Sequence, residues 1–257
     1  MKQAHAQPPA SRRFVRWALG CLVFAATLAQ AQTQPPEAAA SGVPDTIGQR
    51  ATACTPCHGK EGRATNLGYF PRIAGKPEGY LYNQLVNFRE GRRDYALMTY
   101  LVDQLTDDYL LELARYFASV DLPYPPPQTV NAPAELLARG RSLALEGDKP
   151  REIPACVRCH GEALTGVRPF VPGLLGLPRD YLIKQMGAWR TGVRHAASPD
   201  CMAKIAQGIT PEEVAAVATW LSAQPMPADT HPAAPQPASK LPMRCGGLDV
   251  PLAGGTP

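Results

Sequence analysis

The sequence predicts a helical protein made of two similar domains in tandem. The first observation is an internal repeat, in which Pro, Gly, Tyr, Leu, Gln, Arg and Gly recur at a constant offset of 101 residues. The second is an amphipathic helix that closes each copy of the repeat. The third is that the alternation of strands and helices typical of βαβ units is not visible in the sequence. Together these observations favour a duplicated helical unit.

Each copy of the repeat contains the same three short motifs in the same order. Pro-x-x-x-Gly occupies residues 71–75 and again residues 172–176. Tyr-Leu-x-x-Gln follows in both copies, and an Arg-x-Gly turn ends at Gly91 in the first and at Gly192 in the second. This correspondence predicts that the two domains share one fold.

The closing helices carry clear start signals. Thr106 is a predicted N-cap followed by acidic residues in the first turn, and Thr210 with Glu213 forms a predicted capping box. One face of each helix is apolar, which predicts core packing. These apolar residues are Leu110, Leu113, Ala114 and Phe117 in the first helix and Val214, Val217, Ala218 and Leu221 in the second.

Composition shifts divide the chain into six segments. Pro-rich stretches are poor helix formers and read as linkers or tails. The predicted segments are a signal peptide (1–31), a disordered segment (32–44), a first domain (45–121), a Pro-rich linker (122–133), a second domain (134–224) and a Pro-rich tail (225–257).

The N-terminus resembles a secretory signal peptide. It has four basic residues, an apolar run of 13 residues from Trp17 to Ala29, and an Ala-x-Ala cleavage site that ends at Ala31. The run is too short to span a bilayer, although a retained anchor is the alternative. Removal of residues 1–31 takes away four of 26 basic residues and leaves 22 basic and 22 acidic residues, so no nucleic-acid partner is expected.

Two Cys-x-x-Cys-His motifs indicate covalently bound haem. They are Cys54-Thr-Pro-Cys57-His58 and Cys156-Val-Arg-Cys159-His160. Cysteines three residues apart on a helical turn face the same side, so both can form thioethers with one haem, and the next residue is the proximal histidine. Zinc and thioredoxin-like alternatives are disfavoured, because zinc pairs usually lie some 15–20 residues apart and a redox pair needs a βαβ context. The sequence therefore predicts two haem c groups.

The sixth ligand of each iron is predicted to be a methionine. Met98 and Met202 each precede the start of a closing helix by the same number of residues, and a thioether suits iron(II) in electron-carrying cytochromes. The alternative for any single methionine is core packing. The competing residues are Met186, expected in the core, Met226 and Met243, both in the tail, and His195, which would give bis-histidine ligation.

Two further cysteines, Cys201 and Cys245, remain after the signal peptide and the haem motifs are counted. In an oxidising compartment we expect them to form a disulfide that fastens the tail beside the second haem. The alternative is a free Cys201.

From about Asp45 to Ala223 the chain resembles the dihaem class I cytochromes c of the cytochrome c4 type. The resemblance implies an all-α fold of two tandem cytochrome c-like domains related by a pseudo-twofold axis, with haem propionate edges near the interface. It also implies axial pairs His58 with Met98 and His160 with Met202. Members of that family are periplasmic, soluble or membrane-associated, and supply electrons to terminal oxidases.

These features predict a periplasmic electron carrier rather than an enzyme. Expected partners are a quinol:cytochrome c oxidoreductase, a periplasmic dehydrogenase and a terminal oxidase, with peripheral membrane association left open. The first alternative is an enzyme, or the cytochrome subunit of a periplasmic dehydrogenase complex that oxidises a sulfur compound or an alcohol. The second is a sensor or gas-binding module, which needs one haem without its methionine.

Overall fold

The computed structural model describes residues 45–65, 68–248 and 252. These residues lie in one compact unit, Val43–Pro257. The predicted signal peptide and the segment 32–44 lie outside the described residues. In the part of the chain that is described, no helix has both the length and the hydrophobicity needed to cross a membrane.

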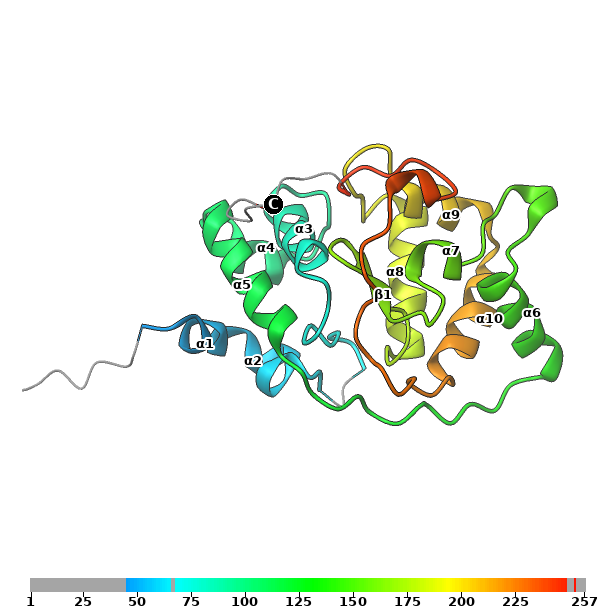
Figure 1. Cartoon of the computed structure of the whole chain (residues 1–257), viewed down its shortest axis with the longest axis horizontal. Coiled ribbons are helices and arrows are strands. Elements are labelled where there is room, and N and C mark those ends of the chain that lie inside the picture. The colour runs from blue at the N-terminus through cyan, green and yellow to red at the C-terminus, as the bar shows by residue number, and fades with distance from the viewer. Residues whose placement is uncertain (1–44, 66–67, 249–251, 253–257) are drawn as a thin grey trace, which may run out of the picture. The chain divides into compact units, whose positions relative to one another are not determined.

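The first domain contains five helices and the second domain repeats much of their order (Figure 1). The helices of the first domain are α1 (Ile47–Arg50), α2 (Thr55–His58), α3 (Glu78–Arg89), α4 (Ala96–Val102) and α5 (Asp107–Ser119), with 3-10 turns at Ala51–Cys54 and Lys60–Gly62. Those of the second domain are α6 (Ala134–Leu145), α7 (Val157–His160), α8 (Arg179–Thr191), α9 (Cys201–Gly208) and α10 (Pro211–Ser222), with a 3-10 turn at Lys149–Arg151. The tail has one 3-10 turn, at Ala238–Lys240.

The second domain also contains a short hairpin that the sequence did not predict. Strands β1 (Gly166–Val167) and β2 (Val171–Pro172) pair antiparallel, with Gly166 opposite Pro172 and Val167 opposite Val171. Each strand has two residues, so the protein remains dominated by helices. The predicted linker 122–133 has no helix or strand.

The closing helices begin where the sequence predicts. The Thr106 hydroxyl accepts a hydrogen bond from the amide of Tyr109, and α5 follows. Thr210 and Glu213 form the complete capping box that opens α10. Both caps satisfy amides that would otherwise lack partners at a helix start.

The Arg-x-Gly turn has a packing role in both domains. Gly91 and Gly192 adopt φ angles of +70° and +75° just after α3 and α8, a region in which glycine pays no steric cost. The arginine two positions earlier reaches the segment just before the closing helix. Arg89 donates to the carbonyl of Leu105 at 2.8 Å, and Arg190 donates to the carbonyl of Ile209. Each arginine therefore fixes the entry to the closing helix.

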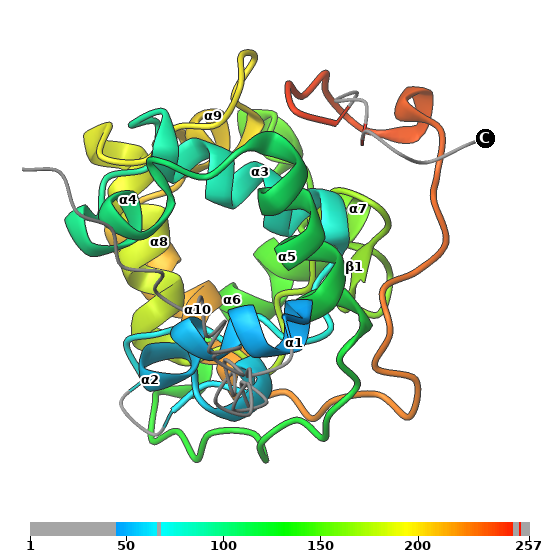
Figure 2. The ribbon, with the colours of Figure 1, turned by 90° about the vertical axis from the view of Figure 1, so that its left-hand side faces the viewer.

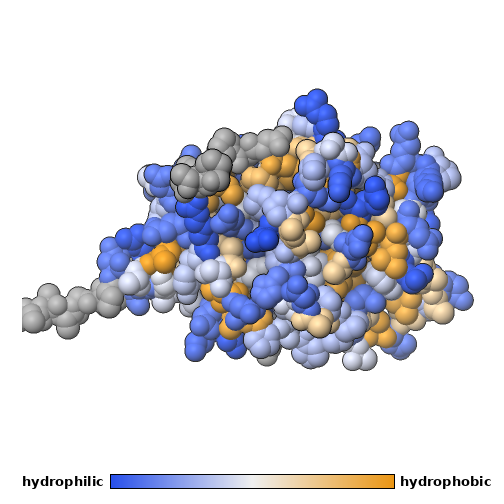
Figure 3. Space-filling view, in the orientation of Figure 1, coloured by the Kyte–Doolittle hydropathy of each residue, from blue (hydrophilic) through white to orange (hydrophobic). Residues whose placement is uncertain are grey.

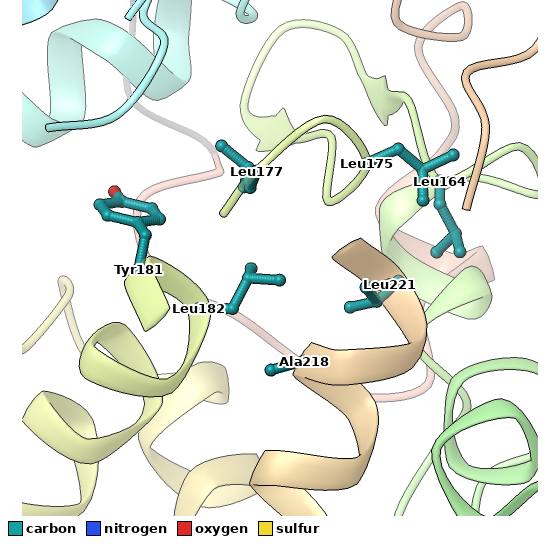
Figure 4. Packing of buried hydrophobic residues seen from close by; sticks show 7 residues of the cluster. All are labelled: Leu164, Leu175, Leu177, Tyr181, Leu182, Ala218 and Leu221. Atoms are coloured by element: carbon teal, nitrogen blue, oxygen red, sulfur yellow. The ribbon is translucent and has the colours of Figure 1, made fainter. Parts of the chain in front are cut away.

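Each domain has its own hydrophobic clusters. The largest cluster of the second domain joins α8, α10 and the loop before α8, as Figure 4 shows. Its buried members are Leu164, Leu175, Leu177, Tyr181, Leu182, Ala218 and Leu221. In the first domain, Leu113, Ala114 and Phe117 of α5 pack with Ala51 and Leu81. The predicted apolar stripes thus face the core, with Val217 half-buried at its edge.

Candidate functional site

Each Cys-x-x-Cys-His motif forms a single helical turn. Cys54 is the N-cap of α2, with Cys57 and His58 inside it, and Cys156 is the N-cap of α7. A turn of this kind places the two cysteines on one side and the histidine next to them. The local geometry is therefore the one that a covalently attached haem needs.

The two histidine rings are held in the same way. The Nδ1 atom of His58 lies 2.9 Å from the carbonyl oxygen of Pro71, and that of His160 lies 2.7 Å from the carbonyl of Pro172. A carbonyl oxygen can only accept a hydrogen bond, so Nδ1 carries the ring proton. Nε2 is then unprotonated and keeps its lone pair free. Such an outer hydrogen bond orients a metal-binding imidazole. Both prolines begin the repeated Pro-x-x-x-Gly motif, whose role could not be read from the sequence.

Burial shifts the pKa values of both histidines and of cysteines in both motifs. It is the main cause that lowers the pKa of His58 and of His160, and the proline carbonyls partly oppose it. The neutral form of each imidazole, which is the form that binds a metal, is therefore favoured. Burial also raises the pKa of Cys156 to about 11 and raises the pKa of Cys54. Thiols with raised pKa values are poor thiolate ligands for zinc. Among the described residues no three His, Cys, Asp or Glu side chains gather at a metal-sized site.

A cavity of about 760 Å³ brings the predicted ligands of both domains together. Its volume falls within the range of roughly 300–1,000 Å³ for sites that hold small molecules or cofactors. The predicted site residues on its walls are Cys54, Cys57, His58 and Met98 from the first domain and Cys159, His160, Cys201, Met202 and Cys245 from the second domain and tail. Cys156 instead packs against the largest hydrophobic cluster of the second domain, the leucine cluster around Leu164, Leu175 and Leu182. The residues present therefore fit covalently attached haem.

The two predicted methionines lie on equivalent helices. Met98 is on α4 and packs against Phe88, Val102 and Leu110, and Met202 is on α9, directly after Cys201. Among the competitors, Met186 packs against the cluster that contains Ile209, Met226 packs against the leucine cluster, and His195 is exposed. Met243 lines the cavity although it belongs to the tail. The sequence holds no periodic signal that would place it there.

Four polar side chains connect the two domains with twofold symmetry. Arg93 donates to Gln84 of its own domain at 3.1 Å and to Gln185 of the other at 2.8 Å. Arg194 donates to Gln185 at 2.6 Å and to Gln84 at 2.8 Å. Both the glutamines and the arginines are 101 residues apart, so the duplication itself produces a self-complementary interface. The repeat offset was the signal that could have identified Arg93 and Arg194.

The tail packs on both domains. Cys245 forms a disulfide with Cys201 at the start of α9, with a Cα–Cα distance of 5.3 Å. The amide of Asn83 on α3 donates to the carbonyl of Gly247 at 2.6 Å. Earlier in the tail, Ala233 forms a parallel bridge with Val167. Figure 2 shows this segment following the right-hand edge of the molecule. Leu241 to Leu248 therefore cover part of the cavity wall beside Met202.

Comparison with known proteins places this arrangement in a family. The chain is 36% identical over 209 residues to a thiosulfate dehydrogenase electron acceptor from Thiomonas intermedia, covering 81% of this chain and 88% of the relative. It is 30% identical over 174 residues to cytochrome c4 from Pseudomonas aeruginosa, covering 67% of this chain and 84% of the relative. The chain belongs to the cytochrome c4 family of dihaem cytochromes. No protein-family model matches it.

The fold agrees with that assignment. The crystal structure of reduced recombinant cytochrome c4 from Pseudomonas stutzeri superimposes with a TM-score of 0.60 at 26% sequence identity, covering 71% of this chain and 99% of that one. As a member of the cytochrome c4 family, the protein is a dihaem electron carrier with two covalently bound haem c groups and two tandem cytochrome c domains.

Proposed function

We propose that the protein accepts single electrons from a dehydrogenase that oxidises a sulfur compound and passes them to a terminal oxidase or another acceptor. The support is the 36% identity to a relative named for accepting electrons from thiosulfate dehydrogenase, which covers more of this chain than the cytochrome c4 match does. A quinol:cytochrome c oxidoreductase is the second candidate donor. The basic and apolar N-terminal segment supports a periplasmic location for this exchange.

The proposed ligands are His58 with Met98 and His160 with Met202, and the proposed attachment residues are the four cysteines of the two motifs. The support for the histidines is the pair of proline carbonyls that leave Nε2 free. The haem supplies the one-electron couple, and a thioether on the sixth position raises its potential. The apolar walls of the cavity keep water away from that couple and lower the local dielectric.

The surface of the molecule in Figure 3 is mixed in character. The face in Figure 3 is mostly hydrophilic, with small hydrophobic areas between the polar residues. The chain without residues 1–31 would have equal numbers of basic and acidic residues. Such a surface supports a transient complex with a small interface rather than strong long-range steering.

The donor is tested by mixing the purified oxidised protein with a thiosulfate dehydrogenase and thiosulfate and following reduction by visible absorbance. We expect rapid reduction that requires both components. A parallel reaction with a quinol:cytochrome c oxidoreductase and quinol tests the second candidate. If thiosulfate and its dehydrogenase reduce the protein no faster than either does alone, the proposed donor is wrong.

The ligands are tested with three methionine variants. Met98→Ala and Met202→Ala should each remove about half of the methionine-to-iron absorption band and allow carbon monoxide to bind one reduced haem. Met186→Ala is the matched control, since this methionine also lines the cavity but packs against Ile209 and its neighbours. An unchanged band in Met98→Ala would show that another residue binds the first iron.

A further inference from the structure

Four basic side chains that line the cavity and are buried or half-buried have no carboxylate partner. They are Arg72, Lys76, Arg93 and Arg194. Arg72, Lys76 and Arg194 are buried, with 3 to 4% of their surface exposed. In the described part of the chain, none of the four forms an ion pair with Asp or Glu. Most arginines that do form ion pairs lie at the surface.

Lys76 has the fewest partners of the four. Its Nζ atom donates one hydrogen bond, to the carbonyl of Gly173 at 3.3 Å, and lies 6.0 Å from the centre of the Tyr124 ring. An ammonium group has three donors, so two are not accounted for by these contacts. A buried cation without a counter-charge costs several kcal/mol. This cost indicates that an anion belongs beside Lys76 in the functional protein.

The position of Lys76 points to the second haem site although the residue belongs to the first domain. Gly173, which accepts its hydrogen bond, directly follows Pro172, whose carbonyl holds the ring of His160. Lys76 therefore presents its charge next to the backbone segment that holds the ring of His160.

The second domain has no basic residue at the position that matches Lys76, so it does not supply an equivalent charge to the first site. At the offset of 101 residues, Lys76 corresponds to Leu177 and Arg72 corresponds to Gly173. Leu177 is a buried member of the hydrophobic cluster of the second domain. The two haem sites thus differ by a buried cation that only the first domain provides.

We propose that Lys76 is the counter-charge, supplied across the domain interface, for a propionate of the haem held by Cys156, Cys159 and His160, and that it raises the reduction potential of that haem relative to the other. Haem propionates are the only anions that the cofactor itself brings into the cavity. A positive charge favours the reduced iron, which carries one positive charge fewer. This inference rests on the proposed ligation of His160 and Met202.

The test is a redox titration of the purified dihaem protein, resolved for each haem by NMR, in Lys76→Met and Lys76→Arg variants. With an effective dielectric of about 20, loss of a unit charge on the order of 12 Å away changes a one-electron equilibrium about tenfold. This change equals ~59 mV for one electron. We expect Lys76→Met to lower the midpoint of the second haem by this amount and that of the first much less. Lys76→Arg should keep both midpoints near those of the wild type.

Two controls make the result decisive. Lys149→Met removes an exposed lysine from the second domain and should leave both midpoints unchanged. Lys76→Leu introduces the residue found at the matched position 177, and serves if the methionine variant does not fold. The inference is overturned if Lys76→Met or Lys76→Leu leaves the second haem unshifted, or if both haems shift equally. A wild-type protein without two low-spin titrating haems would instead refute the proposed ligation.

Discussion

The twofold interface predicts a specific loss of stability when Gln185 is replaced by methionine. Its Oε1 atom accepts hydrogen bonds from Arg93 at 2.8 Å and from Arg194 at 2.6 Å, and these guanidinium groups come from different domains. Methionine has a similar length and no strong acceptor. The change therefore removes one side-chain acceptor from each of two cations at the interface.

The magnitude follows from the number and kind of hydrogen bonds lost. A hydrogen bond to a charged group contributes about 1.5–3 kcal/mol, so two contribute roughly 3–6 kcal/mol if nothing replaces them. Gln84 still accepts from both arginines, at 3.1 and 2.8 Å, and will recover part of this. We expect Gln185→Met to lower the free energy of unfolding by about 2–4 kcal/mol.

Gln84 occupies the matching position in the first domain, so Gln84→Met should lower the free energy of unfolding by a similar amount. In the double variant both guanidinium groups lose their glutamine acceptors. The combined loss should exceed the sum of the single losses by about 0.5–3 kcal/mol, as expected for residues that share partners.

Urea unfolding followed by circular dichroism and by haem absorbance measures these differences, with exposed Gln207→Met as the control. A loss below about 0.5 kcal/mol for Gln185→Met, the value typical of surface changes, would refute the reasoning. A large loss for one glutamine and none for the other would show that the interface is not twofold.

Three further predictions concern stability. Gly140 packs against the backbone of α10, so Gly140→Ala should destabilise the folded protein by about 1–3 kcal/mol through overpacking. This loss is expected although alanine is intrinsically the better helix former by about 1 kcal/mol. A variant that is more stable in thermal unfolding would refute this. The Arg151 guanidinium lowers the pKa of Glu213 to about 2 from its ordinary 4.5, so the stabilising contribution is complete above pH 4.5 and is lost as the pH falls toward 2. The stability gap between wild type and Glu213→Gln, measured by urea unfolding at several pH values, should therefore close over this range. The Cys201–Cys245 disulfide closes a loop of 44 residues and so limits the conformational entropy of the unfolded chain. The double change Cys201→Ser and Cys245→Ser should lower the free energy of unfolding in urea by up to about 4 kcal/mol. An unchanged free energy of unfolding would contradict this entropy argument.

Local features of this fold could be predicted from the sequence because short-range chemistry determines them. The capping box of Thr210 and Glu213 lies within one helical turn, and the structure confirms it. The buried faces of the closing helices follow from a period of 3.6 residues. The duplication followed from repeated motifs, and the resemblance to the cytochrome c4 type implied the all-α class.

Contacts between distant segments could not be predicted in this way. From the sequence, a lysine such as Lys76, followed by Pro77, is expected to be an exposed charge. In the structure it is buried, next to Gly173 of the second domain and Tyr124 of the linker. The carbonyls of Pro71 and Pro172 are backbone groups, to which the identity of the side chain gives no guide. The route of the Pro-rich tail across Val167 and Asn83 likewise depends on tertiary contacts.

The same duplication lets two sites with the same proposed ligands have different surroundings. The prolines that hold the rings of His58 and His160 occupy matching positions in the two copies. A position on the interface of one copy contacts the other copy, so a change in one copy alters the other copy's surroundings. Lys76 opposite Gly173 is such a change: the charge lies in the first domain and its hydrogen-bond acceptor in the second. An unequal pair of haems therefore requires no change in either set of ligands, only a difference across the contact between the domains.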